Sequence, residues 1–264
     1  GSQGRQEQTG VSDQDNCLFH DDRASDGDMA YFEALARYVC DGLNTCGYVY
    51  CPGGVMAKGE WRMAWKDWRR TFQNWMVEPE PKAVMQSSIF FDMRPVAGDL
   101  DLAHSLHSEV LEQARESTLF RRFLAAESMG NRPALGLFGQ FARELGDGDA
   151  RGINLKKRGV IPIVDLARVR ALEGAIGAVH TEERIQAAAE AEVMSPSDAD
   201  DLIHALRFIG NIRLRHQVAL FDAGQTPNHL VDPDELSGLH RRYLRSAFGI
   251  VKTAQRALEQ RYTV

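Results

Sequence analysis

From Asp99 to the end of the sequence, apolar residues recur every three or four positions in long segments separated by short polar breaks. Such spacing places the apolar side chains along one face of an α-helix, and strand-like runs are hard to find among them. Ser195 and Pro196 form a helix-start signal, as do Thr181 and the acidic residues after it. The predicted helical segments are 100–116, 118–129, 135–145, 161–176, one from 181, 195–222 and 234–262. Residues 98–264 are therefore predicted to form an all-helical bundle domain.

Residues 1–97 show a mixed pattern and contain all four tryptophans. Two apolar, β-favouring runs, Asn16–His20 and Gln86–Met93, predict strands, and helical spacing predicts helices over 29–43 and 61–76. The second helix carries an aromatic stripe, either a stacking platform for bases or, more commonly, core: Trp61, Trp65, Trp68, Phe72 and Trp75. We interpret this stripe as core. The predicted fold is α+β, with a small mixed-sheet domain over 1–97 followed by the helical bundle.

Composition excludes several functional classes. The formal net charge of -6 argues against broad electrostatic binding to nucleic acid. No apolar run approaches the ~18 residues of a membrane span, and no secretory signal opens the sequence. Neither a membrane nor nucleic acid is therefore an expected partner, and the cytoplasm is the expected compartment. Cys46 and Cys51 have the spacing of a zinc half-site, but no second close pair follows, so the four cysteines are interpreted as reduced, partly buried thiols.

The opening residues, GSQGRQEQTGVSDQD, carry the chemistry. Gly1, Ser2 and Arg5 supply bare backbone amides, a hydroxyl and a guanidinium, which together suit a triphosphate. In an extended segment residues two apart point to the same side, so Asp13 and Asp15 present two carboxylates together. Two hard oxygen ligands side by side suit a pair of Mg²⁺ ions that bridge nucleotide phosphates and activate an attacking hydroxyl.

A third carboxylate is expected from a neighbouring strand. Asp92 is the only acidic residue of the first region that sits within a strongly β-like run. Arg94 follows it by two, so in an extended strand it would share that face and either meet a phosphate or pair with a carboxylate.

The order GS-x-G-R, D-x-D and a later D resembles the nucleotidyltransferase superfamily typified by DNA polymerase beta, kanamycin nucleotidyltransferase and the PII-protein uridylyltransferase. More closely, four runs resemble a nucleotidyltransferase family often found behind cyclic-nucleotide-binding and paired CBS domains: GSQGRQEQTGVSDQDN, CGYVYCPGGVMAKGEWR, SSIFFDMRPVAGD and GVIPIVDLARVRALEG. The resemblance covers nearly the whole chain, and its GS-x-G-R-x-E-Q and FFDMRPV runs are specific.

The resemblance implies a role for each motif residue. Gly1 and Ser2 would bind the β- and γ-phosphates with Arg5 nearby. Asp13 and Asp15 would hold both metals, while the third carboxylate, Asp92, would complete the second metal site and help deprotonate the acceptor hydroxyl.

Three further residues each allow two interpretations, one as a nucleotide or acceptor contact and one as a structural or surface residue. Glu7 and Gln8 lie in the family-like run and either orient the nucleotide or order the turn. Lys157 lies in a basic cluster that would contact the triphosphate or acceptor in the resembling families, where the helical domain closes over the nucleotide; such a charge run is also typical of a solvated surface.

Two departures from the family pattern stand out. Lys58-Gly59 replaces an expected Asn-Pro after the VMA run. The superfamily's Gly-Ser turn follows a β-strand, and that N-terminal strand is missing from this sequence, which is expected to be a fragment of a longer protein.

The function expected from these motifs is Mg²⁺-dependent transfer of a nucleoside monophosphate from a nucleoside triphosphate, such as ATP, to a hydroxyl of a protein or small-molecule acceptor, with release of pyrophosphate. The alternative is a non-catalytic regulatory module that binds a nucleotide and exchanges a signal with upstream cyclic-nucleotide-binding or CBS domains. Retention of Asp13, Asp15 and Asp92 favours the enzyme. The sequence does not specify the acceptor or the preferred base.

Overall fold

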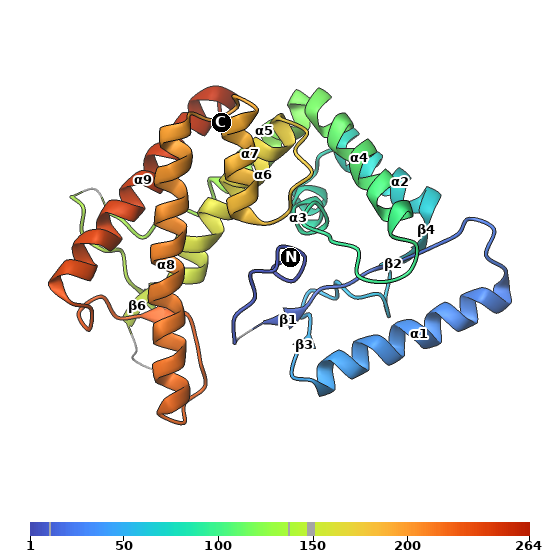
Figure 1. The fold of residues 1–264 in the computed structure, drawn as a ribbon, viewed down its shortest axis with the longest axis horizontal. Helices are drawn as coiled ribbons and strands as arrows, with labels where there is room; N and C mark the ends of the chain where they lie inside the picture. Colours follow the sequence, from blue (N-terminus) through green and yellow to red (C-terminus); the bar gives the residue numbers. More distant parts are fainter. Residues whose placement is uncertain (11, 137, 147–150) are drawn as a thin grey trace. The chain divides into compact units, whose positions relative to one another are not determined.

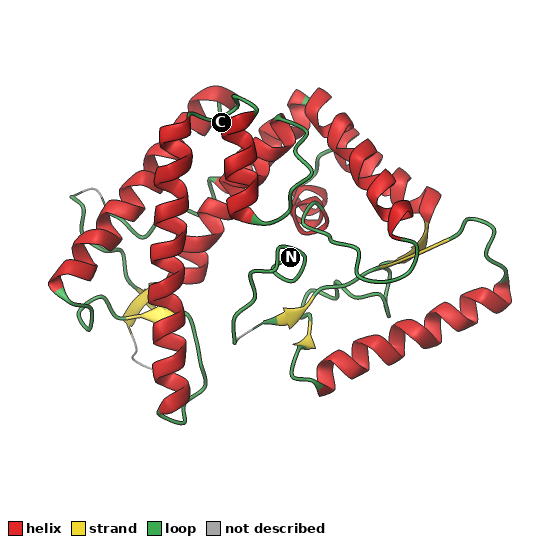
Figure 2. Cartoon of the chain, viewed as in Figure 1, coloured by secondary structure: helices red, strands yellow, loops and turns green. Residues whose placement is uncertain are grey.

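The computed structural model describes residues 1–10, 12–136, 138–146 and 151–264. The chain divides into two compact units, Gly1–Gln113 and Ala114–Val264. Figure 1 follows the chain through its helices and strands, and Figure 2 shows that helices predominate in both units beside short strands. The predicted α+β class is confirmed. Among the described residues, no helix has both the length and the apolar character that crossing a membrane requires.

The first unit is built on two short pairs of parallel strands. Its elements are β1 (Asp13–Gln14), β2 (Leu18–His20), α1 (Asp26–Thr45), β3 (Val49–Tyr50), β4 (Arg62–Ala64), α2 (Trp65–Val77), α3 (Pro81–Phe90) and α4 (Leu100–Glu116). β1 pairs with β3 and β2 with β4. Parallel strands need a crossover connection, which α1 provides. α1 begins at a capping box in which Ser25 and Asp28 each accept the other's backbone N–H.

An aromatic cluster forms the core of this unit. Trp68 and Phe72 of α2 are 0% and 1% exposed, and Phe90 of α3 is 3% exposed. The ring centroid of Trp61 lies 4.4 Å from that of Phe90 and 5.8 Å from that of Trp68. The interpretation of the aromatic stripe as core is confirmed, except that Trp65 is only half-buried and donates its indole N–H to the carbonyl of Leu102 at 3.2 Å.

The predicted strand over Gln86–Met93 is wrong, because most of this segment lies in helix α3. α3 starts at Pro81, a residue whose fixed φ suits the first helical turn. Val84, Ser87 and Phe90 are its buried residues, and their spacing of three is helical. The β-favouring run is the end of a longer helical pattern. Asp92 therefore lies in the turn after a helix, where its backbone N–H donates to the carbonyl of Ile89 at 3.3 Å.

The second unit is a helical assembly with a small antiparallel sheet. Its elements are α5 (Thr118–Ser128), β5 (Glu144–Leu145), β6 (Arg151–Asn154), the π-helical turn η1 (Lys156–Val160), α6 (Ile161–Glu173), α7 (Thr181–Glu190), α8 (Pro196–Asp222), β7 (Leu230–Val231) and α9 (Gly238–Tyr262). The predicted start of α8 is confirmed, since the Ser195 side chain accepts the backbone N–H of Asp198. The predicted helix start at Thr181 is also confirmed.

Two predictions for the second unit are wrong. The sheet, in the order β5-β6-β7, contradicts an all-helical domain; its strands of two to four residues are too short to show a period. The predicted helix over 135–145 is also absent from the described part of that segment, which excludes Leu137. The backbone N–H of Gly136 donates to the carbonyl of Gln140 at 2.8 Å, and Gly139 has a φ of 75°, so a tight glycine loop replaces the helix.

Candidate active site

Alternation along a short extended segment positions Asp13 and Asp15. Gln14, between them, is 0% exposed, and its side-chain amide donates to the carbonyls of Cys40 and Tyr48, each at 2.9 Å. Since neighbouring residues in a strand point to opposite faces, burial of Gln14 turns both flanking carboxylates the other way. Asp13 and Asp15 are half-buried on that face.

Asn16 continues this alternation and locks the segment in place. Its side-chain amide donates to Gln14 Oε1 at 3.0 Å, and its Oδ1 accepts the backbone N–H of Ala57 at 2.9 Å. The thiol of Cys40 donates to the same oxygen at 3.3 Å. Gln14 and Asn16 are positioning residues that the sequence analysis missed. The signal was present, since every second residue of the D-Q-D-N run belongs to one face.

The structure brings Asp13 and Asp15 together with a third residue, Cys51. One potential ligand atom from each lies within 4.8 Å of the other two. Burial is the largest cause of the raised pKa of the Cys51 thiol. A hydrogen bond to Asp15 and the charge of Asp15 raise this pKa further, whereas hydrogen bonds from the backbone N–H groups of Val55 and Gly53 lower it. The interpretation of all four cysteines as simple buried thiols therefore misses the position of Cys51. It describes Cys17 better, whose thiol pKa burial raises to about 12.

The glycine turn lies directly beside these carboxylates. Its backbone closes on itself, with the N–H of Glu7 donating to the carbonyl of Ser2 at 3.0 Å. A Cβ on Gly1 would lie 2.1 Å from Asp15 Oδ2, and a Cβ on Gly4 would lie 1.7 Å from the backbone carbonyl oxygen of Asp92. Both distances are far below contact. Gly4 requires glycine because its neighbour is backbone, whereas at Gly1 the neighbour is the end of the Asp15 side chain, which would have to shift.

Asp92 and Arg5 form a buried ion pair. Arg5 Nη1 bonds to Asp92 Oδ2, and Arg5 Nε donates to Glu7 Oε2 at 2.8 Å. The side chains of Asp92 and Arg5 are 0% and 11% exposed. Asp92 is not a member of the Asp13, Asp15 and Cys51 group. Its expected place in the second metal site stays a prediction, and its contact with Arg5 is a link that the sequence analysis did not foresee.

The remaining predicted nucleotide contacts have different surroundings. Ser2 and Glu7 are half-buried in the turn, whereas Gln8 and Arg94 are exposed. The expectation that Arg94 shares a strand face with Asp92 is wrong, because no strand forms there. Lys157 belongs to the second unit, where it is exposed and its backbone N–H donates to Asn154 Oδ1 at 3.0 Å. The roles of all five in nucleotide binding stay predictions.

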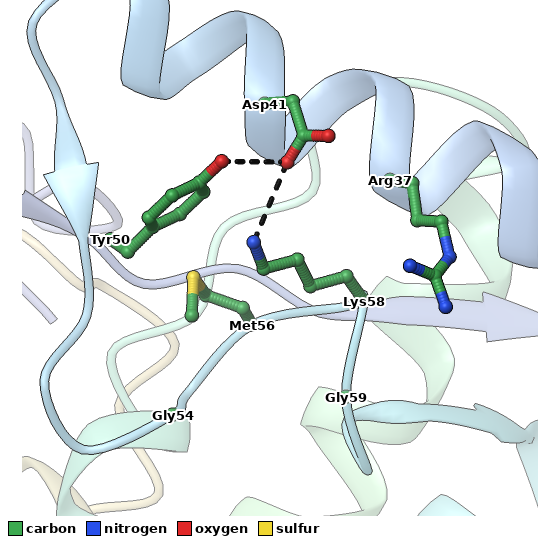
Figure 3. A pocket seen from close by; sticks show the side chains of 7 residues that line it. All are labelled: Arg37, Asp41, Tyr50, Gly54, Met56, Lys58 and Gly59. Atoms are coloured by element: carbon green, nitrogen blue, oxygen red, sulfur yellow. Dashed lines mark hydrogen bonds and ion pairs between the residues drawn. The ribbon is translucent and has the colours of Figure 1, made fainter.

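A pocket of about 540 Å³ is lined by residues of α1 and of the segment from Tyr50 to Gly59 (Figure 3). Tyr50 contributes its ring, and its hydroxyl donates to Asp41 Oδ1 at 2.8 Å. Lys58 Nζ lies 3.4 Å from the same oxygen and 3.4 Å from the centre of the Tyr50 ring. The Tyr50 hydrogen bond is the main cause of the lowered pKa of Asp41. Lys58, where the chain departs from the family pattern, thus holds a specific contact. Tyr50 precedes Cys51, so the two side chains project to opposite sides.

The comparisons with known proteins agree with these motifs. Residues 1–82 match the family described as "Putative nucleotidyltransferase DUF294", and residues 118–262 match "Putative nucleotidyltransferase substrate binding domain". Neither a curated protein nor a solved structure matched the chain. Since the two matches together span most of the sequence, from the glycine turn to the last turn of α9, the chain belongs to the nucleotidyltransferase family that these two descriptions define.

Proposed function

We propose that this protein is a metal-dependent nucleotidyltransferase that moves a nucleoside monophosphate from a nucleoside triphosphate to a hydroxyl of a protein or small-molecule acceptor, releasing pyrophosphate. The observation that carries the proposal is the position of Asp13 and Asp15 on one face of the β1 segment, with Gly1 of the glycine turn packed against the Asp15 carboxylate. The family supplies the general reaction class.

The donor set suits a divalent cation. Asp13 and Asp15 provide anionic oxygens within 4.8 Å of each other, and both side chains are half-buried, so they are accessible to a ligand. A bound divalent cation, Mg²⁺ in the expectation from sequence, would neutralise phosphate charge and acidify the attacking hydroxyl. Two ions are expected, one of them shared with Asp92.

The turn from Gly1 to Glu7 is proposed to hold the β- and γ-phosphates. Its bare glycines let the backbone approach a ligand closely, and the hydroxyl of Ser2 adds a donor. Because the turn packs against Asp15, phosphates held there would lie next to the carboxylates. In the proposed reaction the acceptor hydroxyl attacks the α-phosphate in line and expels pyrophosphate.

Arg5 and Asp92 are proposed to exchange partners when the nucleotide binds. In the structure Arg5 bonds the carboxylates of both Asp92 and Glu7, and removing the charge partner of the 0% exposed Asp92 carboxylate would be costly. A triphosphate offers Arg5 another anionic partner, which would free the Asp92 carboxylate for the second metal site and for the acceptor proton. The predicted roles of Arg5 in phosphate binding and of Asp92 in metal binding would then both depend on this exchange of partners.

The decisive experiment measures pyrophosphate release from labelled nucleoside triphosphates incubated with the protein, a divalent cation and cell extract. Asp13→Asn and Asp15→Asn should each lower release by about 10²–10³-fold, the size of losing one group that stabilises developing charge. Their thermal midpoints should stay close to that of the parent protein, because both side chains are half-exposed.

A matched control is Asp99→Asn, a change at an exposed aspartate of the same unit, which should leave release unchanged. Release that survives both active-site changes would contradict the assignment. Calorimetry that detects nucleotide binding while no pyrophosphate forms would support the regulatory module instead.

A further inference from the structure

The thiol of Cys51 lies in the carboxylate cluster, although the proposed function gives it no role. Its sulfur is within 4.8 Å of ligand oxygens of both Asp13 and Asp15. The contact arises because β3 runs parallel to β1, with Asp13 opposite Val49 and Gln14 opposite Tyr50. One step further along each segment brings Asp15 and Cys51 to the same face.

A tight turn holds this sulfur in place. The backbone N–H of Gly54 donates to the carbonyl of Cys51 at 3.0 Å, and Gly54 has a φ of 71°, a conformation that favours glycine. A Cβ on Gly53 would lie 3.7 Å from Cys51 Sγ, so the turn covers one side of the sulfur.

The other three cysteines have different surroundings. Cys40 is buried and donates to Asn16 Oδ1, Cys17 is half-buried, and Cys46 is exposed at the end of α1. Within the described residues, Cys51 is the cysteine that joins a group of potential metal ligands.

We propose that Cys51 Sγ is a direct ligand when Asp13 and Asp15 hold a borderline cation rather than Mg²⁺, a step that rests on the metal binding assigned to these carboxylates in the proposed function. Mg²⁺ takes oxygen ligands, whereas thiolate sulfur favours borderline cations such as Co²⁺ and Zn²⁺. When the sulfur–metal bond forms, the thiol proton is released to solvent. The site is therefore a mixed carboxylate–thiolate site, whose affinity for Co²⁺ depends on Cys51 and whose affinity for Mg²⁺ does not.

The test titrates the whole chain with Co²⁺ alone and follows the near-ultraviolet charge-transfer band of a cobalt–thiolate bond. The parent protein should develop the band, Cys51→Ser should lose it, and the exposed-cysteine control Cys46→Ser should retain it. Cys51→Ser should also weaken Co²⁺ binding by at least about tenfold, because even changes behind the ligands cost this much. Its Mg²⁺ affinity should change by less than about threefold, since Mg²⁺ is satisfied by oxygen.

Two further variants keep this test decisive. Cys51→Asp replaces sulfur by a hard oxygen ligand, so it should abolish the band while tightening Mg²⁺ binding. Asp13→Asn should weaken binding of both cations. Near-ultraviolet circular dichroism of each variant without metal, dominated by the tryptophan cluster, checks that the first unit is folded.

A parent protein without the band, or a band that persists in Cys51→Ser, would overturn the proposal. Its failure is distinguishable from failure of the proposed function, because the band requires no turnover. Pyrophosphate release with no cobalt–thiolate band would retain the enzyme and remove Cys51 from its site. A Cys51-dependent band in a protein that releases no pyrophosphate would retain Cys51 as a metal ligand and contradict the proposed enzyme activity.

Discussion

The two units use buried charge for different purposes. In the first unit, the Arg5–Asp92 pair ties the glycine turn to the residue that follows α3 by two positions. In the second unit, Glu173 at the end of α6, with a side chain 8% exposed, bonds Arg170 of the same helix at 2.9 Å and also Arg261 of α9. The Arg5–Asp92 pair fixes a loop, whereas Glu173 joins two helices.

This difference separates the geometry of the site from the stability of the scaffold. The turn has little apolar area with which to hold its shape, so a buried ion pair and close glycine packing hold it instead. α6 already buries nine of its residues, among them Ile163, Leu166 and Leu172, so its ion pairs add to a core that exists without them. Changes to the first pair should alter ligand binding, and changes to the second should alter stability alone.

The largest expected effect is that of Asp92→Asn. The variant removes the Asp92 carboxylate from the buried Arg5 guanidinium, which keeps its bond to Glu7. Breaking a buried ion pair typically costs about 3–5 kcal/mol, and the remaining Glu7 contact places the expected loss towards the lower end. We expect a lower free energy of unfolding and weaker nucleotide binding, measured by urea denaturation and calorimetry.

The comparison variant is Glu173→Gln, which removes the carboxylate shared by Arg170, 13% exposed, and Arg261, 54% exposed, and should also lower the free energy of unfolding. It should leave nucleotide affinity unchanged. If Glu173→Gln weakened nucleotide binding as much as Asp92→Asn, the contrast between the two units would be wrong.

A smaller effect is expected from Gly4→Ala. The new Cβ would lie 1.7 Å from the carbonyl oxygen of Asp92, which is backbone and has no rotamer into which to move. Overpacking of this kind costs about 1–3 kcal/mol, and relief of the clash must displace the turn. Nucleotide affinity should fall together with the thermal midpoint.

Gly10→Ala is the matched control for this change, since a Cβ there would meet no atom within 4 Å. Equal losses of affinity in the two variants would show that flexibility along the segment, rather than packing of Gly4 on Asp92, governs binding.

The smallest effect expected is a pH dependence confined to the second unit. The pKa of His229 is lowered to about 4, mainly by burial and further by the nearby charges of Lys156 and Arg213. Since the neutral imidazole is favoured in the folded state, its contribution to stability is present above the unfolded pKa of about 6.5 and is lost as pH falls towards 4. The protection of amides around β7, measured by hydrogen exchange and corrected for the intrinsic exchange rate at each pH, should therefore fall between pH 7 and pH 5.

His229→Gln should weaken this loss of protection, and the exposed-histidine control His204→Gln should not. The neutral Gln217 side chain, 2.9 Å from His229 Nδ1, remains a partner for either residue. An undiminished loss of protection in His229→Gln would assign the pH dependence to other groups.

Local patterns predicted those parts of the fold that depend on near neighbours. The Ser195 cap and the bounds of α8 follow from residues within one turn of each other, and so does the start of α7. The shared face of Asp13 and Asp15 follows from the period of an extended chain. The burial of Trp68, Phe72 and Trp75 of α2 was likewise predictable, because aromatic rings that recur at helical spacing form an apolar face that packs in a core.

The predictions were wrong in short segments whose residue spacing fits both a helix and a strand, or fits neither. The QSSIFFDM run is β-favouring by composition, yet its place in α3 is decided by Pro81 and by the burial of Val84, Ser87 and Phe90. The strands of the second unit are two to four residues long, and such segments become strands only when a partner backbone is available.

The sequence by itself determined the family, the α+β class, the glycine turn and the paired carboxylates, because each is recognised from residues that are close together in the sequence. Only the tertiary structure placed Cys51 beside Asp13 and Asp15, and Arg5 against Asp92. The first contact needs the parallel pairing of β1 with β3 across α1, and the second spans 87 positions. Contacts of this kind depend on how distant segments pack, a property that no local spacing encodes.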